Sequence, residues 1–449
     1  MKMIQVLFIT LLVILKLSIH AQSWDALGSE GFSSGEAYNQ CIALNNEIPY
    51  VAYIDDAYNG KATVMKFSGT GWESVGIEGF TNVPVSSISF AIDDGIPYLA
   101  YIDNENEKKA SVMMFDDENW VYLGQANFST ANASSVSLAM DNGVPFIAFQ
   151  DWAHGRKITV MKLDDGNWET VGSAGFSTCS LPNVISLAVY EEVPFVAYRD
   201  TDNSHKASVM KFNGDTWVVV GLQGFSGGTH DAYQCIAIKD GYPYVTSWNS
   251  DGKAAVYLFN GAKWSIFGNN GLSLGQATYS SITFSNDGTP YLGFSDIGNE
   301  GKVTVMKFEE SNWILLGTAL SPGQSSYISL AVTDNGKPIV AYRDEFNMRR
   351  TSVMEWNNPD GIDVTDIDSK FSIFPNPSDG IFTIEGSLLK DNNLKIEIIN
   401  PVGQPIMMKK SEYLNECHFD LSGISNGIYY VKIINNREVY LKTVVINKH

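Results

Sequence analysis

The stretch from Trp72 to Trp120 reads WESVGIEGFTNVPVSSISFAIDDGIPYLAYIDNENEKKASVMMFDDENW, and its pattern recurs throughout residues 22–356. A tryptophan followed four residues later by glycine occurs at Trp24, Trp72, Trp120, Trp168, Trp217, Trp264 and Trp313. An apolar run that opens with proline and ends in Asp or Asn begins at Pro49, Pro97, Pro145, Pro194, Pro243, Pro290 and Pro338. A segment similar to Val-Met-Lys-Phe begins at Val64, Val112, Val160, Val209, Val256, Val305 and Val353. These three anchors, spaced by about 48 residues, identify seven copies of one structural unit.

Each repeat contains four short β-rich runs separated by Gly, Asn, Asp and Pro. In the second repeat the expected strands are Ser87–Ile92, Tyr98–Ile102, Ala110–Phe115 and Trp120–Leu123. Short runs without helical periodicity are typical of strands, and Asp-Asp-Gly is typical of the turns between them. Four strands in each of seven repeats predict an all-β fold, a seven-bladed β-propeller. A β-solenoid is the alternative, although its coils are usually shorter.

The two ends of the repeat region predict how the ring closes. The region begins with a fourth strand, Trp24–Leu27, and ends with a third strand, Val353–Trp356. The N-terminal strand therefore completes the last blade, which leaves no open sheet edge. We expect each repeated Trp to pack between blades and each repeated Gly to permit a tight turn. The repeated Asp is expected to cap a turn, with a ring of ligands as the alternative.

Composition excludes several classes of protein. The chain has 449 residues, 44% hydrophobic residues and a formal net charge of −20. An acidic chain is a poor nucleic-acid binder, and one this apolar is not disordered. The four cysteines are too few for a disulfide scaffold, so we predict four free thiols. Cys41 and Cys235 occupy equivalent first-strand positions typical of small buried apolar residues, whereas Cys179 is expected to be the most accessible thiol.

Residues 1–21 have the pattern of a signal peptide. Lys2 precedes an apolar run from Val6 to Leu17, and Ala21 ends the segment with a small residue. A membrane anchor is the alternative, but Lys16 interrupts the run, which is shorter than the roughly 20 residues that a span needs. No later segment has the length and hydrophobicity of a span, so we expect an exported chain without a transmembrane segment.

A different organisation begins after residue 356. Residues 357–370 are polar and acidic and indicate a linker. Residues 371–449 contain eight basic and eight acidic residues and no copy of the repeat. Alternating strands are expected at Phe371–Phe374, Ile381–Glu385, Lys395–Ile399, Tyr429–Ile434 and Leu441–Ile446. This pattern predicts a small Ig-like β-sandwich.

Motifs in this second region carry a family resemblance. Phe374-Pro375-Asn376-Pro377 is followed by Gly380, and later come Asn400-Pro401-Val402-Gly403 and Asn426-Gly427-Ile428-Tyr429. Their order resembles the type A C-terminal sorting domain of the bacterial type IX secretion system. The resemblance implies a sorting motif that contains Pro375, Asn376, Pro377, Gly380, Gly403, Gly427 and Tyr429. It also implies the Sec route, the type IX machinery as a partner, and secretion or attachment at the outer-membrane surface. An accessory Ig-like adhesion module is the alternative.

The candidate binding site comes from positions where the repeats differ. The residue before the repeated Asp or Asn is Ile54, Ile102, Gln150, Arg199, Trp248, Ser295 or Arg343. This position lies towards the face that carries the longer loops, where function usually resides. The candidate ligand-binding residues are Gln150, Trp152, His154, Arg199, Asp202, His205, His230, Trp248 and Arg343. Aromatic faces beside charged groups suit glycans, because rings stack on sugars and charges orient hydroxyls.

Catalytic and cofactor motifs are absent from the sequence. It has no Gly-x-Ser-x-Gly elbow, no phosphate-binding loop and no His-Glu-x-x-His spacing, so no cofactor or metal is expected. We therefore expect a monomeric, non-enzymatic binding protein whose ligand is a glycan or a surface protein. A glycan-active hydrolase or lyase and a protein-interaction scaffold remain alternatives. The blade pattern also loosely resembles fucose-binding propeller lectins, which are six-bladed, and no residue is carried over from them.

Overall fold

The computed structural model describes residues 23–179, 181–229, 234–317, 320–357, 371–386, 389, 392–400, 405–412, 416–435 and 438–448. The chain divides into two compact units, of which one is Ser23–Asn357 and the other contains Asn358–His449. Their regular structure in the described residues consists of β-strands and four short 3-10 turns, without α-helices. None of the described segments forms a helix long and apolar enough to cross a membrane. The predicted signal peptide and most of the predicted linker lie outside the described residues.

The unit Ser23–Asn357, here called the repeat unit, contains seven four-stranded antiparallel sheets. The first sheet contains β2 (Ala37–Asn45), β3 (Ile48–Asp55), β4 (Lys61–Phe67) and β5 (Trp72–Ser74). The second contains β6 (Val85–Asp93), β7 (Ile96–Asp103), β8 (Ala110–Phe115) and β9 (Trp120–Tyr122). The third contains β10 (Ala133–Asp141), β11 (Val144–Asp151), β12 (Lys157–Asp164) and β13 (Asn167–Thr170).

The remaining sheets repeat this order. The fourth contains β14 (Asn183–Tyr190), β15 (Val193–Asp200), β16 (Lys206–Phe212) and β17 (Trp217–Val219). The fifth contains β18 (Ile236–Lys239), β19 (Tyr242–Trp248), β20 (Ala254–Phe259) and β21 (Trp264–Ile266). The sixth contains β22 (Ala277–Phe284), β23 (Pro290–Asp296), β24 (Lys302–Glu309) and β25 (Asn312–Leu315). The seventh contains β26 (Ser325–Val332), β27 (Pro338–Asp344), β28 (Arg350–Asn357) and β1 (Ser23–Ala26).

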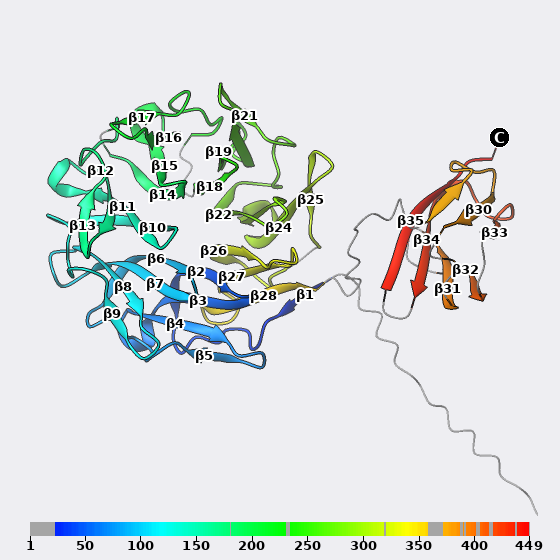
Figure 1. Ribbon diagram of the computed structural model, residues 1–449, viewed down its shortest axis with the longest axis horizontal. Helices are drawn as coiled ribbons and strands as arrows, with labels where there is room; N and C mark the ends of the chain where they lie inside the picture. The colour runs from blue at the N-terminus through cyan, green and yellow to red at the C-terminus, as the bar shows by residue number, and fades with distance from the viewer. Residues whose placement is uncertain are drawn as a thin grey trace, which may run out of the picture. The chain divides into compact units, whose positions relative to one another are not determined.

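Apolar side chains join each sheet to the next. Figure 1 shows the first strand of each sheet towards the middle of the repeat unit and the short fourth strand towards its edge. One cluster joins Ile54 of the first sheet to Ile88 and Leu99 of the second, and similar clusters follow between later sheets. A further cluster joins Ile339 and Ala341 of the seventh sheet to the first sheet. The hydrophobic core is therefore divided among the inter-sheet spaces.

The repeated tryptophans bond from one sheet to the next. The indole Nε1 of Trp72 donates to the Leu27 carbonyl at 2.8 Å, and Trp120, Trp168, Trp217, Trp264 and Trp313 bond equivalent carbonyls. Trp24 donates to the Leu316 carbonyl at 2.7 Å. The repeated glycine is required for two reasons, its backbone conformation and the close approach of the next tryptophan. Gly76 has φ 75°, and a Cβ there would lie 3.2 Å from the Trp120 ring. The repeated Trp and Gly thus form a unit of packing between sheets.

A second set of contacts joins the first strands. Hydroxyls of Ser89, Ser137, Ser186, Ser281 and Ser329 accept hydrogen bonds from backbone amides of Leu138, Leu187, Ile236, Leu330 and Ile42, respectively. Cys41 and Cys235 occupy the same position, beside the amides of Phe90 and Ile282. Burial raises the pKa of the Cys41 thiol to about 12. These two cysteines therefore take the place of a hydrogen-bonding serine, not only of a small apolar residue.

All four cysteines are free thiols, as predicted, but the prediction that Cys179 is the most accessible is wrong. Cys179 is 1% exposed because its loop folds back onto the fourth sheet. Within this loop the Ser177 hydroxyl bonds both the Ile158 amide and the Cys179 carbonyl. Burial raises the pKa of Cys179 to about 12, so its thiolate is scarce at neutral pH.

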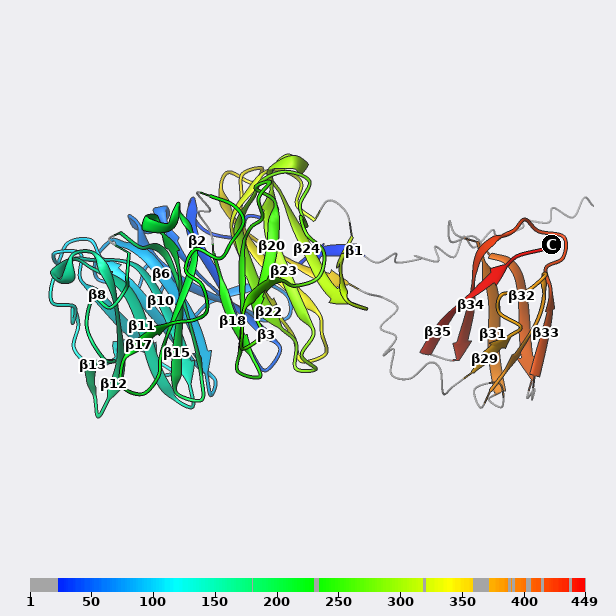
Figure 2. The ribbon, with the colours of Figure 1, turned by 90° about the horizontal axis from the view of Figure 1, so that it is seen from above.

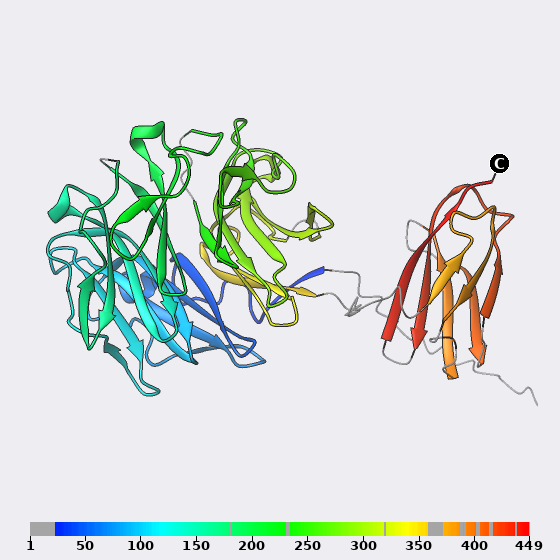
Figure 3. The same ribbon diagram turned by 45° about the horizontal axis from the view of Figure 1, so that its top comes forward.

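The C-terminal unit contains two sheets that share one core. One contains β29 (Ser372–Phe374), β30 (Ile381–Glu385) and β33 (Glu416–Asp420). The other contains β32 (Pro405–Glu412), β31 (Asn392–Ile399), β34 (Gly427–Asn435) and β35 (Glu438–Ile446), coloured orange to red in Figure 3. Phe382 and Phe419 of the first sheet pack with Ile396 and Val431 of the second. The sequence prediction missed β32 and β33, whose many polar and charged residues weaken the apolar pattern.

Candidate functional site

The repeated Asp at the end of the second strand of each sheet caps a turn. Asp55, Asp151, Asp200 and Asp296 accept backbone amides of the turns η1 (Asp56–Tyr58), η2 (Trp152–His154), η3 (Thr201–Asn203) and η4 (Ile297–Asn299). Asp103, Asn249 and Asp344 accept backbone amides in the equivalent turns. These seven side chains are at most 3% exposed, which supports the capping interpretation over a ring of ligands. Figure 2 shows the short turns along one edge of the repeat unit, here called the turn face.

The variable position before this cap lies opposite a backbone bulge. Ser134 pairs with Gln150, Asn183 with Arg199 and Ser326 with Arg343, and the register shifts immediately afterwards. The residue at the bulge has a positive φ in six repeats, namely Asn39, Ser87, Ser135, Val184, Tyr279 and Tyr327. A bulge redirects side chains locally. The bulge residue on the first strand and the residue before the cap on the second strand therefore lie at the same end of each sheet, and both vary among the repeats.

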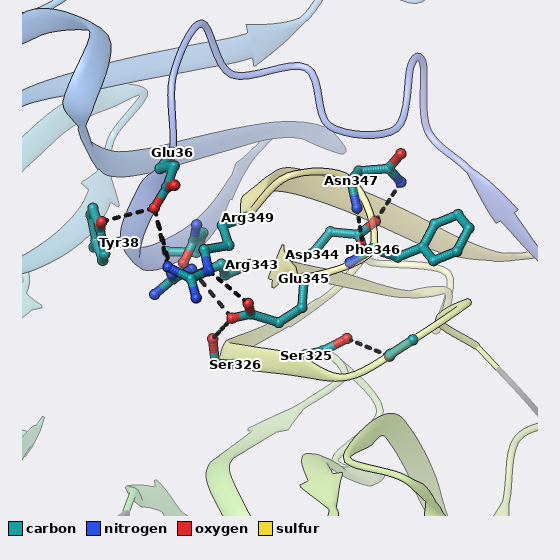
Figure 4. Close-up of polar contacts among 12 residues, drawn as sticks. Glu36, Tyr38, Ser325, Ser326, Arg343, Asp344, Glu345, Phe346, Asn347 and Arg349 are labelled. Carbon is teal, nitrogen blue, oxygen red and sulfur yellow. Dashed lines mark hydrogen bonds and ion pairs between the residues drawn. The ribbon is translucent and has the colours of Figure 1, made fainter.

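Arg343 lies in the densest group of charges on the turn face, shown in Figure 4. Its Nη2 lies 3.8 Å from Glu36 Oε2 and its Nε lies 3.4 Å from Glu345 Oε1. Its guanidinium also stands 4.6 Å from the centre of the Tyr38 ring. Arg349 contacts the same two carboxylates at 3.6 and 3.1 Å. The group, here called the Arg343 cluster, joins the seventh sheet to the first.

The Arg343 cluster has a fixed interior and an accessible rim. Arg343 is 9% exposed, whereas the side chain of Arg349 is 54% exposed. Glu345 and Glu36 raise the pKa of Arg349, which stays charged. Burial, with hydrogen bonds to Glu36 and Asp56, raises the pKa of Tyr38 to about 12, so this hydroxyl stays protonated. Chemically the rim offers charged and hydroxyl groups that can bond a ligand's hydroxyls.

Aromatic side chains continue from this cluster along the turn face. The Tyr327 and Tyr279 rings lie 5.0 Å apart, centre to centre, and Arg343 bonds Tyr327. Trp248 Nε1 donates to the Ala277 carbonyl at 2.6 Å, which ties this ring to the sixth sheet. Trp248, Tyr279, Tyr327 and Tyr38 are all half-buried and come from sheets five, six, seven and one. We call these four residues the aromatic arc.

Sequence reasoning identified Trp248 and Arg343 but missed Tyr38, Tyr279, Tyr327, Glu36, Glu345 and Arg349. The signal was present in the alignment of the repeats. In the sequence the bulge position is Asn or Ser in the first three repeats, Val in the fourth and Tyr in the last three. On the strands, the predicted site used only the variable residue of the second strand. The first strand pairs with it at this position and also varies among the repeats.

The candidates on the third sheet make local contacts. Gln150 accepts from the Ser134 hydroxyl at 2.7 Å and donates to the Pro182 carbonyl at 2.6 Å. His154 Nδ1 lies 2.8 Å from the capping carboxylate of Asp151. Trp152 is 44% exposed, and the Arg156 guanidinium lies 3.9 Å from the centre of its ring. The His154 side chain is also 44% exposed, so Trp152 and His154 are the accessible candidates of this sheet.

The candidates on the fourth sheet lie at the end of β15 and in the turn after it. Arg199 is half-buried, and its Nε is buried without a hydrogen-bond partner in the described part of the chain. Asp202 is exposed within η3, and His205 is half-buried with φ 59°. The third histidine, His230, lies outside the described residues. In the described ranges no three His, Cys, Asp or Glu side chains gather as a metal site requires.

Comparisons with known proteins give one match to a family and several to solved structures. No curated protein matches the sequence. The fucose-specific lectin from Aleuria aurantia is 14% identical with a TM-score of 0.46, over 63% of this chain and 96% of that chain. SapL1 lectin, solved with alpha methyl fucoside, is 13% identical with a TM-score of 0.43, over 65% and 97%. These distant likenesses do not identify a ligand for this chain.

The C-terminal unit gives the specific match. Asn376, which the sequence analysis places in the sorting motif, donates to the Thr443 carbonyl and accepts from the Val445 amide. The Gly380 amide donates to Ser378, and the Tyr429 hydroxyl donates to the Ser425 carbonyl. The Pro375, Pro377 and Gly427 positions are described, whereas Gly403 lies outside the described residues. Residues 372–447 match the family of the secretion system C-terminal sorting domain, as the motifs predicted.

Proposed function

We propose that this chain is an exported glycan-binding protein of the cell surface or the medium. Its segments are a signal peptide (1–21), a closed seven-bladed β-propeller (22–356), a linker (357–370) and a type IX sorting domain (371–449). The propeller binds the glycan on its turn face, and the sorting domain is recognised by the secretion machinery. The match of residues 372–447 to the sorting family is the observation that carries the export role.

Three independent contacts support a closed ring. β1 pairs with β28, so strands from the two ends of the repeat region complete one sheet. The Trp72 indole of the first sheet donates to the carbonyl of Leu27, which follows β1 of the seventh sheet, as Trp120 donates to Val75. Ser329 bonds Ile42 as Ser89 bonds Leu138. The same contacts therefore occur between the last and first sheets as between consecutive ones.

The aromatic arc carries the glycan proposal. Half-buried aromatic rings from four sheets lie beside the Arg343 cluster, so apolar faces and charged groups share one edge. Sugars present apolar C–H faces together with hydroxyls, and such a surface can stack on the former and bond the latter. The rings are already fixed by hydrogen bonds and neighbours, which lowers the entropy lost on binding.

A glycan array with the purified full chain tests the binding role. We expect glycans to be retained and Tyr327→Ala to weaken their binding by about tenfold, because one stacking ring is lost. Tyr242→Ala is the matched control, since Tyr242 is 48% exposed but begins β19, at the opposite end of that strand from Trp248. Failure to retain any glycan, or equal loss in the two variants, would contradict the glycan proposal.

Deletion of Phe371–His449 tests the export role. We expect the shortened chain to accumulate in the periplasm of its host, because the element that the translocon recognises is gone. Fractionation and immunoblotting measure this, and circular dichroism of the retained chain checks that the repeat unit is folded. Residues 358–449 fused to an unrelated periplasmic protein should carry that protein out. Normal arrival of the shortened chain at the surface would refute the sorting role.

A further inference from the structure

An arginine and a glutamine occur together at two of the inter-sheet spaces. The variable residue before the cap faces the same space as a residue on the first strand of the next sheet, as the apolar clusters show for Ile54 and Ile88. The seven pairs are Ile54/Ile88, Ile102/Val136, Gln150/Ile185, Arg199/Gln234, Trp248/Ser280, Ser295/Ile328 and Arg343/Gln40. Arginine on the second strand occurs only with glutamine on the next first strand, and cysteine follows that glutamine both times.

Between the seventh and first sheets this pair has carboxylate, aromatic and hydroxyl neighbours, although Arg343 Nε and Gln40 Oε1 form no hydrogen bond within the described residues. Glu36 and Glu345 flank Arg343 at 3.8 and 3.4 Å, and the Tyr38 ring lies beside its guanidinium. Gln40 Nε2 donates to Thr351 Oγ1 at 3.2 Å. The arginine charge is therefore balanced by groups of the protein itself.

Between the fourth and fifth sheets the same pair lacks the counterparts of two of these partners, and the counterpart of Glu36, His230, lies outside the described residues. Thr201 stands in the repeat position of Glu345, and Ala207 stands in that of Thr351. Within the described residues, Arg199 forms no ion pair, and its buried Nε has no hydrogen-bond partner. Gln234 is 5% exposed, and neither atom of its amide has a partner there.

The side chain that faces this space from the second strand of the fifth sheet is smaller than the tyrosine at the matching place in its counterpart. Ser247 is 3% exposed and stands where the first, second, fourth and seventh sheets have Tyr53, Tyr101, Tyr198 and Tyr342. Its hydroxyl has no partner among the described residues. Ala197 and Val245 belong to one apolar cluster between the fourth and fifth sheets. Arg199 and Ser247 follow them by two residues on their strands, so their side chains face the same space. Ile236 of that cluster follows Gln234 by two residues, as Ile42 follows Gln40.

Unpaired buried polar groups are costly, so such a group of them indicates a ligand. Within the described residues this space holds a guanidinium Nε, an amide and a hydroxyl that have no hydrogen-bond partner, and each has lost the bonds that it would make with water. A guanidinium matches a carboxylate in geometry and charge, while the amide can both donate and accept. We propose that the space between the fourth and fifth sheets binds the carboxylate of an acidic sugar, a uronic acid. This inference rests on the proposed glycan function and adds the sugar class.

Titration calorimetry of the full chain with D-galacturonate tests the site, with D-galactose and acetate as probes of ring and charge. We expect galacturonate to bind about tenfold more tightly than galactose, and added salt to weaken it, because the contact is ionic. Arg199→Gln should remove this preference, and Ser247→Tyr should block the site while filling it as tyrosine does elsewhere. Gln40→Leu is the matched control for Gln234→Leu, and only the latter should weaken binding.

The possible results separate this inference from the proposed function. Equal affinity for galacturonate and galactose, or full binding by Arg199→Gln, would overturn the carboxylate site. Glycan-array binding that Tyr327→Ala weakens and Arg199→Gln leaves intact would preserve the proposed function alone. Acetate bound as tightly as galacturonate would overturn the assignment to a sugar. Thermal unfolding of Ser247→Tyr shows whether its lost binding reflects a blocked site in a folded protein.

Discussion

Two inter-sheet spaces have an arginine, a glutamine and a cysteine at equivalent positions. One lies between the seventh and first sheets, and the other lies between the fourth and fifth sheets. In the first, Glu36 and Glu345 neutralise Arg343. In the second, no described carboxylate pairs with Arg199, and the Gln234 amide has no hydrogen-bond partner among the described residues. Identical residue types thus have different neighbours in the two spaces. A charge that is balanced internally stabilises contact between sheets, and one that is not is available to a ligand.

The position of the neutralised pair is informative. It lies between the sheet that contains β1 and β28 and the sheet that begins with β2. Contacts there join residues almost 300 apart, such as Ser329 and Ile42. In the proposed closed ring, this is the space where the two ends of the propeller meet. The Arg343 cluster adds ionic contacts at that junction, whereas the space around Arg199 lies within the continuous chain.

The largest effect is expected from removing the carboxylates beside Arg343. Glu36→Gln with Glu345→Gln leaves a nearly buried guanidinium without its anions, and we expect the free energy of unfolding to fall by about 2 kcal/mol. The reciprocal change, Thr201→Glu, offers Arg199 a carboxylate and should abolish galacturonate binding without lowering stability. Urea denaturation measures the stabilities. Unchanged stability of the double variant would show that Arg343 needs no internal anion, and the contrast between the two spaces would fail.

A smaller effect concerns Tyr53, which faces the space between the seventh and first sheets where Ser247 faces the other. Burial, followed by the Asp55 charge, holds the pKa of Tyr53 well above its usual value of about 10. Its folded pKa is raised, so its contribution to stability is complete below about pH 10 and is lost as the pH rises further. Because the Tyr53 hydroxyl has no hydrogen-bond partner within the described ranges, Tyr53→Phe should change stability little at pH 7.

The measurement is the free energy of unfolding of the wild type and Tyr53→Phe from pH 7 to 11. We expect the variant to become the more stable of the two above pH 10, by a margin that grows with pH. Ser247→Phe is the control at the matching position, and it removes no ionisable group, so its difference from the wild type should not change with pH. A constant difference for Tyr53→Phe would mean that the folded protein accepts the ionised phenol.

Much of the fold followed from local pattern. The strands of the second repeat were predicted to within about two residues, because turn residues and apolar runs are adjacent in sequence. The capping role of the repeated Asp was also the favoured interpretation, since Asp bonds amides only two or three residues away. The Cys179 prediction failed because its burial depends on how the loop folds back, which no local pattern records.

The candidate site was less predictable. Trp248, Arg199 and Arg343 were found because they break the repeat on one strand. Tyr279 and Tyr327 were missed because their side chains reach the rim through a bulge, a backbone feature without a strong sequence signal. Glu36 was missed because it lies 307 residues from Arg343, and a separation of that size gives no indication of contact.

The sequence by itself determined the number of repeats, the four strands of each, and the sorting motifs of the last unit. These depend on residues close together in the chain, where strand alternation and turn chemistry act. Only the tertiary structure decided that Arg343 lies beside two carboxylates, whereas no described carboxylate pairs with Arg199. The reason is physical: electrostatic and hydrogen-bond energies depend on distance and burial, and the groups that determine them here come from different repeats.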